Sequence, residues 1–115
     1  MVRFEIPVKT VSESNLREHW RARMTRSRGQ RQLSMLATRQ AVRCLIFTAS
    51  QKFVITITRI GARKLDGDNL ANSQKHVRDG IADALGIDDG SDRLDWRYAQ
   101  RRGKPREYSV EVQIE

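Results

Sequence analysis

Aspartates are concentrated in the second half of this sequence. Eight of them lie between Asp66 and Asp95, in a chain that has 22 basic and 14 acidic residues. Asp66 and Asp68 are two residues apart, so their carboxylates point the same way if the segment is extended, and Gly67 lets the backbone bend. Mg²⁺ is usually held by one or two carboxylates together with water and substrate phosphate. The spacing therefore predicts a divalent-metal site.

A second acidic pair follows the next predicted helix. Asp88 and Asp89 come just after the expected end of that helix, and a chain that folds back on itself would bring them toward Asp66. Asp92 and Asp95 are further acids in the same region. The later metal ligand stays open among Asp88, Asp89 and Asp92.

Lys75 adds a cation at a helical spacing from the first pair. It lies seven residues beyond Asp68, which is nearly two helical turns, so Asn72, Lys75 and Asp79 are expected on the same face as Asp68. A lysine there would contact a scissile phosphate or stabilise a leaving oxygen as charge develops.

Each of these residues also has a purely structural interpretation. Asp68 or Asn69 is a natural helix N-cap, and the segment Asp88–Gly90 is a natural turn. Lys75 alone is typical of a solvated surface residue. The functional hypothesis depends on the residues occurring together.

The charge of the chain predicts a polyanionic partner. The formal net charge is +8 and the isoelectric point is about 10.5. Such an excess favours nucleic acid, because neutralising phosphates releases condensed counterions. Basic residues gather in an arginine-rich segment, a turn and a later loop. The predicted DNA-binding residues are Arg21, Arg23, Arg26, Arg28, Arg31, Arg63, Lys64, Arg101, Arg102 and Lys104.

Other features indicate where the protein works. No apolar stretch approaches the roughly 20 residues that a membrane-spanning helix needs, and the N-terminus has no signal-peptide core. The single cysteine, Cys44, is expected to be a buried or half-buried thiol. A cytoplasmic protein is expected.

Alternation of apolar and polar residues predicts the strands. These are Val2–Val8, ending near Pro7, then Lys52–Ile60, then a closing pair, Leu94–Gln100 and Tyr108–Ile114, joined by a basic hairpin loop over residues 101–106. In the second strand, Phe53, Ile55 and Ile57 alternate with Thr56 and Thr58.

Helical periodicity predicts two main helices. The first lies within Leu16–Ala49, starts after Ser12–Asn15 and breaks near Gly29. The second runs from about Asn69 to Leu85 and ends at Gly86. Its apolar positions are Leu70, Val77, Ile81, Ala84 and Leu85, and those of the first helix are Leu33, Leu36, Ala37, Ala41 and Leu45.

The order β-α-β-α-β-β predicts the fold class. It indicates one α/β or α+β domain over residues 1–115, with a small mixed sheet and two main helices.

At this point the sequence resembles a known family. The motif Asp66-Gly-Asp68-Asn69-Leu70, then Lys75, then Asp83-Ala-Leu85, then Ile87-Asp88-Asp89 resembles the RusA family of Holliday-junction resolvases. That family carries a D-x-D-N motif, a nearby lysine, a D-A-L helix end and a later D-D pair. The match is best over residues 63–89 and extends more weakly over the chain. The lysine follows the motif less closely here than is usual in the family.

The resemblance implies a RusA-like endonuclease of bacterial or phage origin. Such a protein is a homodimer that nicks four-way DNA junctions symmetrically during recombination and repair, with Mg²⁺, or alternatively Mn²⁺, as cofactor. On this resemblance Asp66, Asp68 and Asp89 bind metal and are catalytic, Lys75 assists, and Asp88 is the main rival of Asp89 as a metal ligand.

Three other functions remain open from the sequence. One is a non-catalytic DNA-binding module. Another is a nuclease acting on flaps, forks or RNA, for which the same metal site would serve. The third is a small domain that binds a protein partner through its acidic and basic segments.

Overall fold

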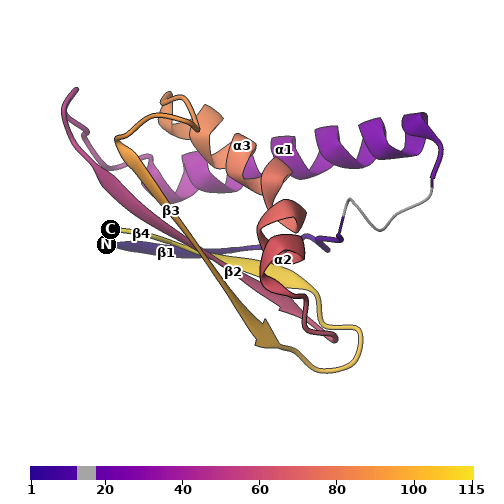
Figure 1. Cartoon of the computed structure of the whole chain (residues 1–115). Coiled ribbons are helices and arrows are strands. Elements are labelled where there is room, and N and C mark those ends of the chain that lie inside the picture. Colours follow the sequence, from indigo (N-terminus) through magenta and orange to yellow (C-terminus); the bar gives the residue numbers. More distant parts are fainter. Residues whose placement is uncertain (13–17) are drawn as a thin grey trace.

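The computed structural model describes residues 1–12 and 18–115. Along the chain the elements are β1 (Val2–Ile6), α1 (Trp20–Val42), β2 (Phe53–Gly61), α2 (Gly67–Ser73), α3 (Lys75–Leu85), β3 (Leu94–Arg102) and β4 (Ser109–Ile114). The four strands form one mixed sheet in the order β1-β4-β2-β3 (Figure 1). The predicted α+β class with a small mixed sheet is confirmed.

The sheet differs from the prediction at its closing strands. β3 pairs in parallel with β2, while β4 pairs antiparallel with both β2 and β1. β3 and β4 therefore lie on opposite sides of β2, and the predicted hairpin between them is wrong. Their connection crosses the end of β2, where the Gly103 N–H donates to the Gly61 carbonyl at 2.9 Å. The parallel pairing is allowed because α2 and α3 supply the long crossover that it needs.

One face of the sheet builds the core. Phe53, Ile55 and Ile57 of β2 are at most 4% exposed, as their alternation predicts. The helices lie on one side of the sheet in Figure 1. Apolar residues of the core cluster come from all four strands and from α1 and α3: Ile6, Val42, Phe53, Ile55, Ile57, Val77, Ile81, Ala82, Leu94, Val110, Val112 and Ile114.

Helix α1 is more regular than predicted. It runs without a break through Gly29, so the predicted interruption is wrong. A single helical glycine costs only about 1 kcal/mol relative to alanine, which packing of the helix can offset. The helix ends at Val42, before the predicted Ala49. Most of the predicted start, Ser12–Asn15, lies outside the described residues.

The buried face of α1 is more polar than predicted. Its buried residues are Gln30, Ser34, Thr38 and Val42. By contrast, Leu36 of the predicted apolar stripe is 51% exposed, and Leu45, also predicted in that stripe, lies beyond the helix and is 46% exposed. The Ser34 and Thr38 hydroxyls donate to the carbonyls of Gln30 and Ser34, both at 2.7 Å. These hydrogen bonds remove the cost of burying the hydroxyls.

The predicted second helix is two helices. α2 ends and α3 begins around Gln74, whose side chain is fully buried and donates to the Thr10 hydroxyl at 2.9 Å. Leu70, Val77 and Ile81 are buried as predicted. Gly86 ends α3 with φ of 68°, a left-handed conformation that favours glycine.

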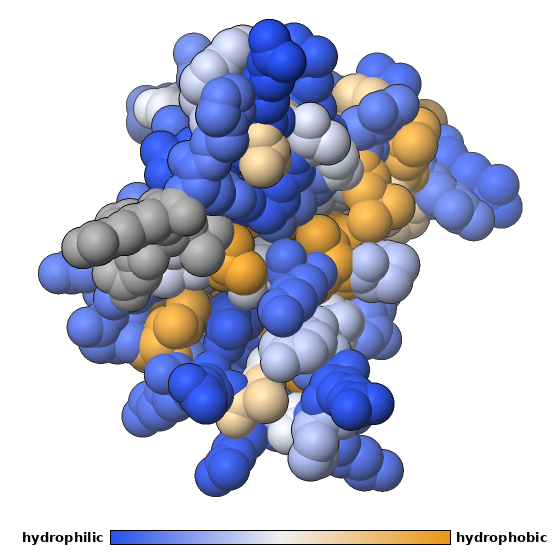
Figure 2. Space-filling view, turned by 90° about the vertical axis from the view of Figure 1, so that its right-hand side faces the viewer, coloured by the Kyte–Doolittle hydropathy of each residue, from blue (hydrophilic) through white to orange (hydrophobic). Residues whose placement is uncertain are grey.

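The prediction about the exposure of Cys44 is wrong. Cys44, expected to be at least half buried, is exposed in the segment after α1. Within the part of the chain that the structure describes, no helix has the length and apolar character required to cross a membrane. Hydrophilic residues cover most of the face shown in Figure 2, with apolar residues in a band between them.

Candidate metal and nucleic-acid site

The first aspartate pair lies where a helix begins. Asp66 is the N-cap of α2, and its Oδ1 accepts a hydrogen bond from the Asn69 N–H at 3.3 Å. The prediction that Asp68 or Asn69 is the cap is therefore wrong. Asp68 lies in the first turn of α2 and is exposed. Partial positive charge at a helix N-terminus stabilises a carboxylate at both positions.

Asp68 and Asp89 line one cavity of about 420 Å³. Its walls come from α2, from α3, from the loop after α3 and from β3. The lining residues are Asp68, Ala71, Asn72, Lys75, Arg78, Asp89 and Tyr98. The fold thus brings a carboxylate from each predicted pair and the predicted lysine into the lining of one cavity.

Arg78 connects the walls of this cavity. Its Nη2 donates to the Asp89 carbonyl at 3.0 Å, and its Nε lies 3.4 Å from the Asp89 carboxylate. Nη1 donates to the Tyr98 hydroxyl at 3.0 Å, and the guanidinium lies 4.8 Å from the Trp96 ring centroid. The Trp96 Nε1–H also donates to the Asp89 carbonyl, at 2.8 Å. Together these contacts fix the position of Asp89. Arg78 was not among the predicted site residues.

The remaining predicted acids have other surroundings. Asp88 Oδ1 accepts from the Gly90 N–H at 3.0 Å, as the turn interpretation expects. Asp79 and Asp88 line a neighbouring cavity of about 390 Å³, which Asp89 also borders. Asp79 was predicted on the face of Asp68. That prediction is wrong, because the helix breaks between α2 and α3 and the spacing does not carry through.

The oxygen donors of the cavity that contains Asp68 and Asp89 suit a hard cation. Among residues 1–12 and 18–115, no three His, Cys, Asp or Glu side chains are grouped closely enough to hold a metal by themselves. Asp68 and Asp89 offer two carboxylates, and Asn72 offers an amide oxygen. Mg²⁺ typically uses one or two carboxylates and completes its shell with water and phosphate.

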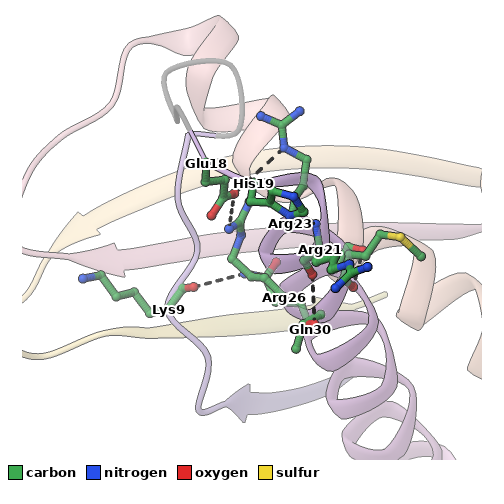
Figure 3. Close-up of polar contacts among 10 residues, drawn as sticks. Lys9, Glu18, His19, Arg21, Arg23, Arg26 and Gln30 are labelled. Atoms are coloured by element: carbon green, nitrogen blue, oxygen red, sulfur yellow. Dashed lines mark hydrogen bonds and ion pairs between the residues drawn. The ribbon is translucent and has the colours of Figure 1, made fainter.

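Predicted DNA-binding arginines of α1 are partly engaged within the protein. Figure 3 shows Glu18 beside Arg23 and Arg26; it pairs with Arg26 and lies 3.9 Å from Arg23 Nε. Arg21 lies over the ring of Trp20, 5.3 Å from its centroid. Trp20 is 59% exposed. Arg28 is also exposed.

Arg31 holds α1 against α3 through Asp83. Its Nε and Nη2 donate to the two Asp83 carboxylate oxygens at 2.6 and 2.9 Å. The hydrogen bond from Arg31 holds the pKa of Asp83 below its ordinary value of 3.8. Arg31, a predicted DNA-binding residue, therefore already makes a contact between α1 and α3.

Four predicted DNA-binding residues gather at one end of the sheet. β2 and β3 are parallel, so their carboxyl ends lie at the same edge. A cavity of about 490 Å³ lies there, lined by Arg59, Gly61, Ala62, Arg63, Lys64, Gln100, Arg101 and Arg102. Lys104, in the following loop, is exposed and does not line this cavity.

Arg59 and Gln100 were also not among the predicted site residues. They lie opposite each other in the β2–β3 register. The Gln100 amide accepts from the Leu65 N–H at 2.9 Å and donates to the Leu65 carbonyl at 2.7 Å. This pair of bonds fixes the segment that leads to Asp66. A signal for Arg59 was available, because it continues the inward alternation of Phe53, Ile55 and Ile57.

Comparisons with known proteins give no match for this chain. No protein-family model matches the chain, and neither the curated proteins nor the solved structures searched contain a similar protein. The resemblance to the RusA family therefore stays a prediction that rests on the motif residues of the chain itself.

Proposed function

We propose that this protein is a metal-dependent, structure-specific DNA endonuclease that nicks four-way junctions. The observation that carries the proposal is the shared cavity of Asp68, Lys75 and Asp89. Carboxylates and a lysine around one cavity suit metal-assisted hydrolysis of a phosphodiester.

Asp68 and Asp89 would hold Mg²⁺ or Mn²⁺, with the Asn72 amide oxygen as a further donor. Asp66 stays a third candidate ligand because it is exposed and only two residues before Asp68. A bound divalent ion lowers the pKa of a coordinated water and neutralises charge on the phosphate.

Residues of the chain would supply the remaining parts of the reaction. Lys75 is exposed at the start of α3, where its ammonium can contact the scissile phosphate and stabilise charge on the leaving oxygen. Arg78 holds Asp89 through its carboxylate and its carbonyl. The basic residues at the ends of β2 and β3 would grip phosphates and position the DNA without reading its sequence.

Paired nicks need two sites. A homodimer with twofold symmetry would present one cavity to each of two strands in a junction. This arrangement fits a role in DNA recombination and repair. Comparing junctions with flaps, replication forks and RNA distinguishes the proposed substrate from the alternative ones.

Junction cleavage tests the proposal. A labelled four-way junction is incubated with the protein in Mg²⁺ or in EDTA, beside an Asp68→Asn variant. Paired nicks are expected only in Mg²⁺, and Asp68→Asn should lower the rate at least about 100-fold while leaving junction binding largely intact, because transition-state stabilisation is lost but phosphate contacts are not.

The matched control is Asp95→Asn. Asp95 is exposed at the start of β3 and pairs with Arg97 at 3.1 Å, outside the cavity, so this variant should cleave normally. A second candidate function is a non-catalytic DNA-binding module, favoured by a basic cavity that shares no lining residue with the cavity of Asp68 and Asp89. A junction that is bound but never cut supports that alternative.

A further inference from the structure

Arg59 is buried at a position that an apolar residue would normally occupy. Within β2 it lies on the same face as Phe53, Ile55 and Ile57, and it is 7% exposed. Burying a charge is costly unless other groups compensate it. Arginine stays protonated in proteins, so it cannot avoid this cost by becoming neutral. Its presence here therefore needs a compensating anion or a function.

The protein compensates this charge only in part. The Nη1 of Arg59 donates to the Arg63 carbonyl at 2.8 Å. Its buried Nε has no hydrogen-bond partner, and the ion pairs found in the described part of the chain do not include Arg59. Burial accordingly lowers the pKa of Arg59 from its ordinary value, although the group stays charged.

The cavity around Arg59 is lined by four other cations together with Gly61, Ala62 and Gln100. Arg63, Lys64, Arg101 and Arg102 line the same cavity of about 490 Å³, and no carboxylate is among its lining residues. A Cβ on Gly61 would lie 2.8 Å from Arg59 Nη1, so any side chain at position 61 would displace the guanidinium. A planar guanidinium flanked by other cations is suited to the oxygens of a phosphate group.

We propose that the cavity around Arg59 is a phosphate-binding pocket that holds one phosphate of a nucleic-acid chain. The nucleic-acid ligand rests on the proposed function, whereas phosphate binding itself requires neither the metal nor cleavage. An internal phosphodiester and a terminal phosphomonoester share the necessary chemistry. The exposed side chains of Arg63, Lys64 and Arg101 would then contact neighbouring phosphates along the nucleic-acid backbone.

Inorganic phosphate is the first probe. Thermal unfolding of the whole chain is followed with and without phosphate at constant ionic strength, without Mg²⁺. A ligand that binds only the folded state raises the melting temperature. Phosphate should stabilise the wild type but neither Arg59→Met nor Gly61→Ala. Without phosphate, Arg59→Met should melt at or above the wild-type temperature, because it removes a poorly compensated buried charge.

Lys52→Met is the matched control. Lys52 is exposed just before the start of β2, at the opposite end of the strand from Arg59, and its loss changes the net charge equally. Phosphate should stabilise this variant as it does the wild type. Equal stabilisation of all variants, or no stabilisation of the wild type, would overturn the proposal. So would an Arg59→Met protein that melts lower in the absence of phosphate, because that result indicates a structural role.

A single-stranded oligonucleotide then identifies the source of the phosphate. Binding is measured in EDTA in the Asp68→Asn background, so a failure of cleavage cannot affect the result. Arg59→Met and Gly61→Ala should weaken binding at least about tenfold, and Lys52→Met much less. Equal weakening by all three contradicts the proposal. If these variants lose affinity for oligonucleotides both with and without a 5′-phosphate, the pocket holds an internal phosphodiester. If they lose affinity only for the oligonucleotide that carries a 5′-phosphate, the pocket holds a terminal phosphate.

Discussion

Arg78 is the residue on which the geometry of the candidate metal cavity depends. Its guanidinium contacts the Asp89 carbonyl, the Asp89 carboxylate and the Tyr98 hydroxyl, and it lies over Trp96. These groups belong to the loop after α3 and to β3. One side chain therefore holds the later aspartate against the helices that carry Asp68 and Lys75.

Replacing Arg78 by lysine should separate geometry from charge. Lysine keeps the positive charge but lacks the planar fork of donors. We expect Arg78→Lys to lower the free energy of unfolding by about 1–3 kcal/mol. We expect junction cleavage to fall at least about tenfold, which corresponds to about 1.4 kcal/mol of transition-state stabilisation. Denaturant unfolding and single-turnover cleavage measure the two effects. Arg97→Lys, at an exposed position in β3, is the control, and cleavage by Arg78→Lys at the wild-type rate would contradict the assigned role.

Local spacing predicted some of these residues and not others. Asp68, Asn72 and Lys75 were expected to share a face, and they line one cavity, although Lys75 lies in α3, just beyond the helix break at Gln74. Arg78 was not identified because its partners come from a loop and from β3, and a helical arginine by itself resembles a solvated residue. Contacts between distant segments leave no local pattern.

Among the elements, α1 and α3 meet through small residues. A Cβ on Gly80 of α3 would lie 2.3 Å from the Arg31 carbonyl and 2.7 Å from the Ser34 Cβ. The backbones of the two helices therefore approach closely at this point. Hydropathy could not predict the interface, because Ser34 and Thr38 count as polar although their hydroxyls are satisfied by α1 itself.

Two glycine variants test this interface. Gly80→Ala should lower the free energy of unfolding by about 1–3 kcal/mol, because overpacking outweighs the gain in helix propensity. Gly29→Ala changes the same residue type in a helix where a Cβ would meet nothing within 4 Å. It should raise stability by about 0.5–1 kcal/mol. Denaturant unfolding of both variants provides the measurement, and a stabilised Gly80→Ala protein would show that the close helix contact is wrong.

The Arg31–Asp83 pair should make this interface sensitive to acid. The folded pKa of Asp83 is depressed by Arg31, so its contribution to stability is present above the unfolded value and is lost as pH falls through the lower folded value. The window therefore lies below about pH 4. Both side chains are partly exposed, at 53% and 34%, which limits the effect to about 1 kcal/mol. Stability measured against pH should be flatter in Asp83→Asn than in the wild type; an unchanged pH profile would exclude the pair as its source.

For the whole molecule, the one-sided sheet was predictable and its strand order was not. Alternation in β2 and β4 indicates one buried face, and the apolar residues of that face do form the core. The placement of β3 beyond β2 depends on the crossover through α2 and α3. That crossover also allows Asp68 and Asp89 to line one cavity, so the candidate metal site exists only in the assembled fold.

Binding of Mn²⁺ tests this central claim most directly. Mn²⁺ is titrated into the folded protein without DNA, and free Mn²⁺ is measured by electron paramagnetic resonance. Asp68→Asn and Asp89→Asn should each weaken binding at least about tenfold, or about 1.4 kcal/mol, while Asp95→Asn should bind as the wild type does. If both cavity variants bind Mn²⁺ as tightly as the wild type, the two aspartates do not form one metal site.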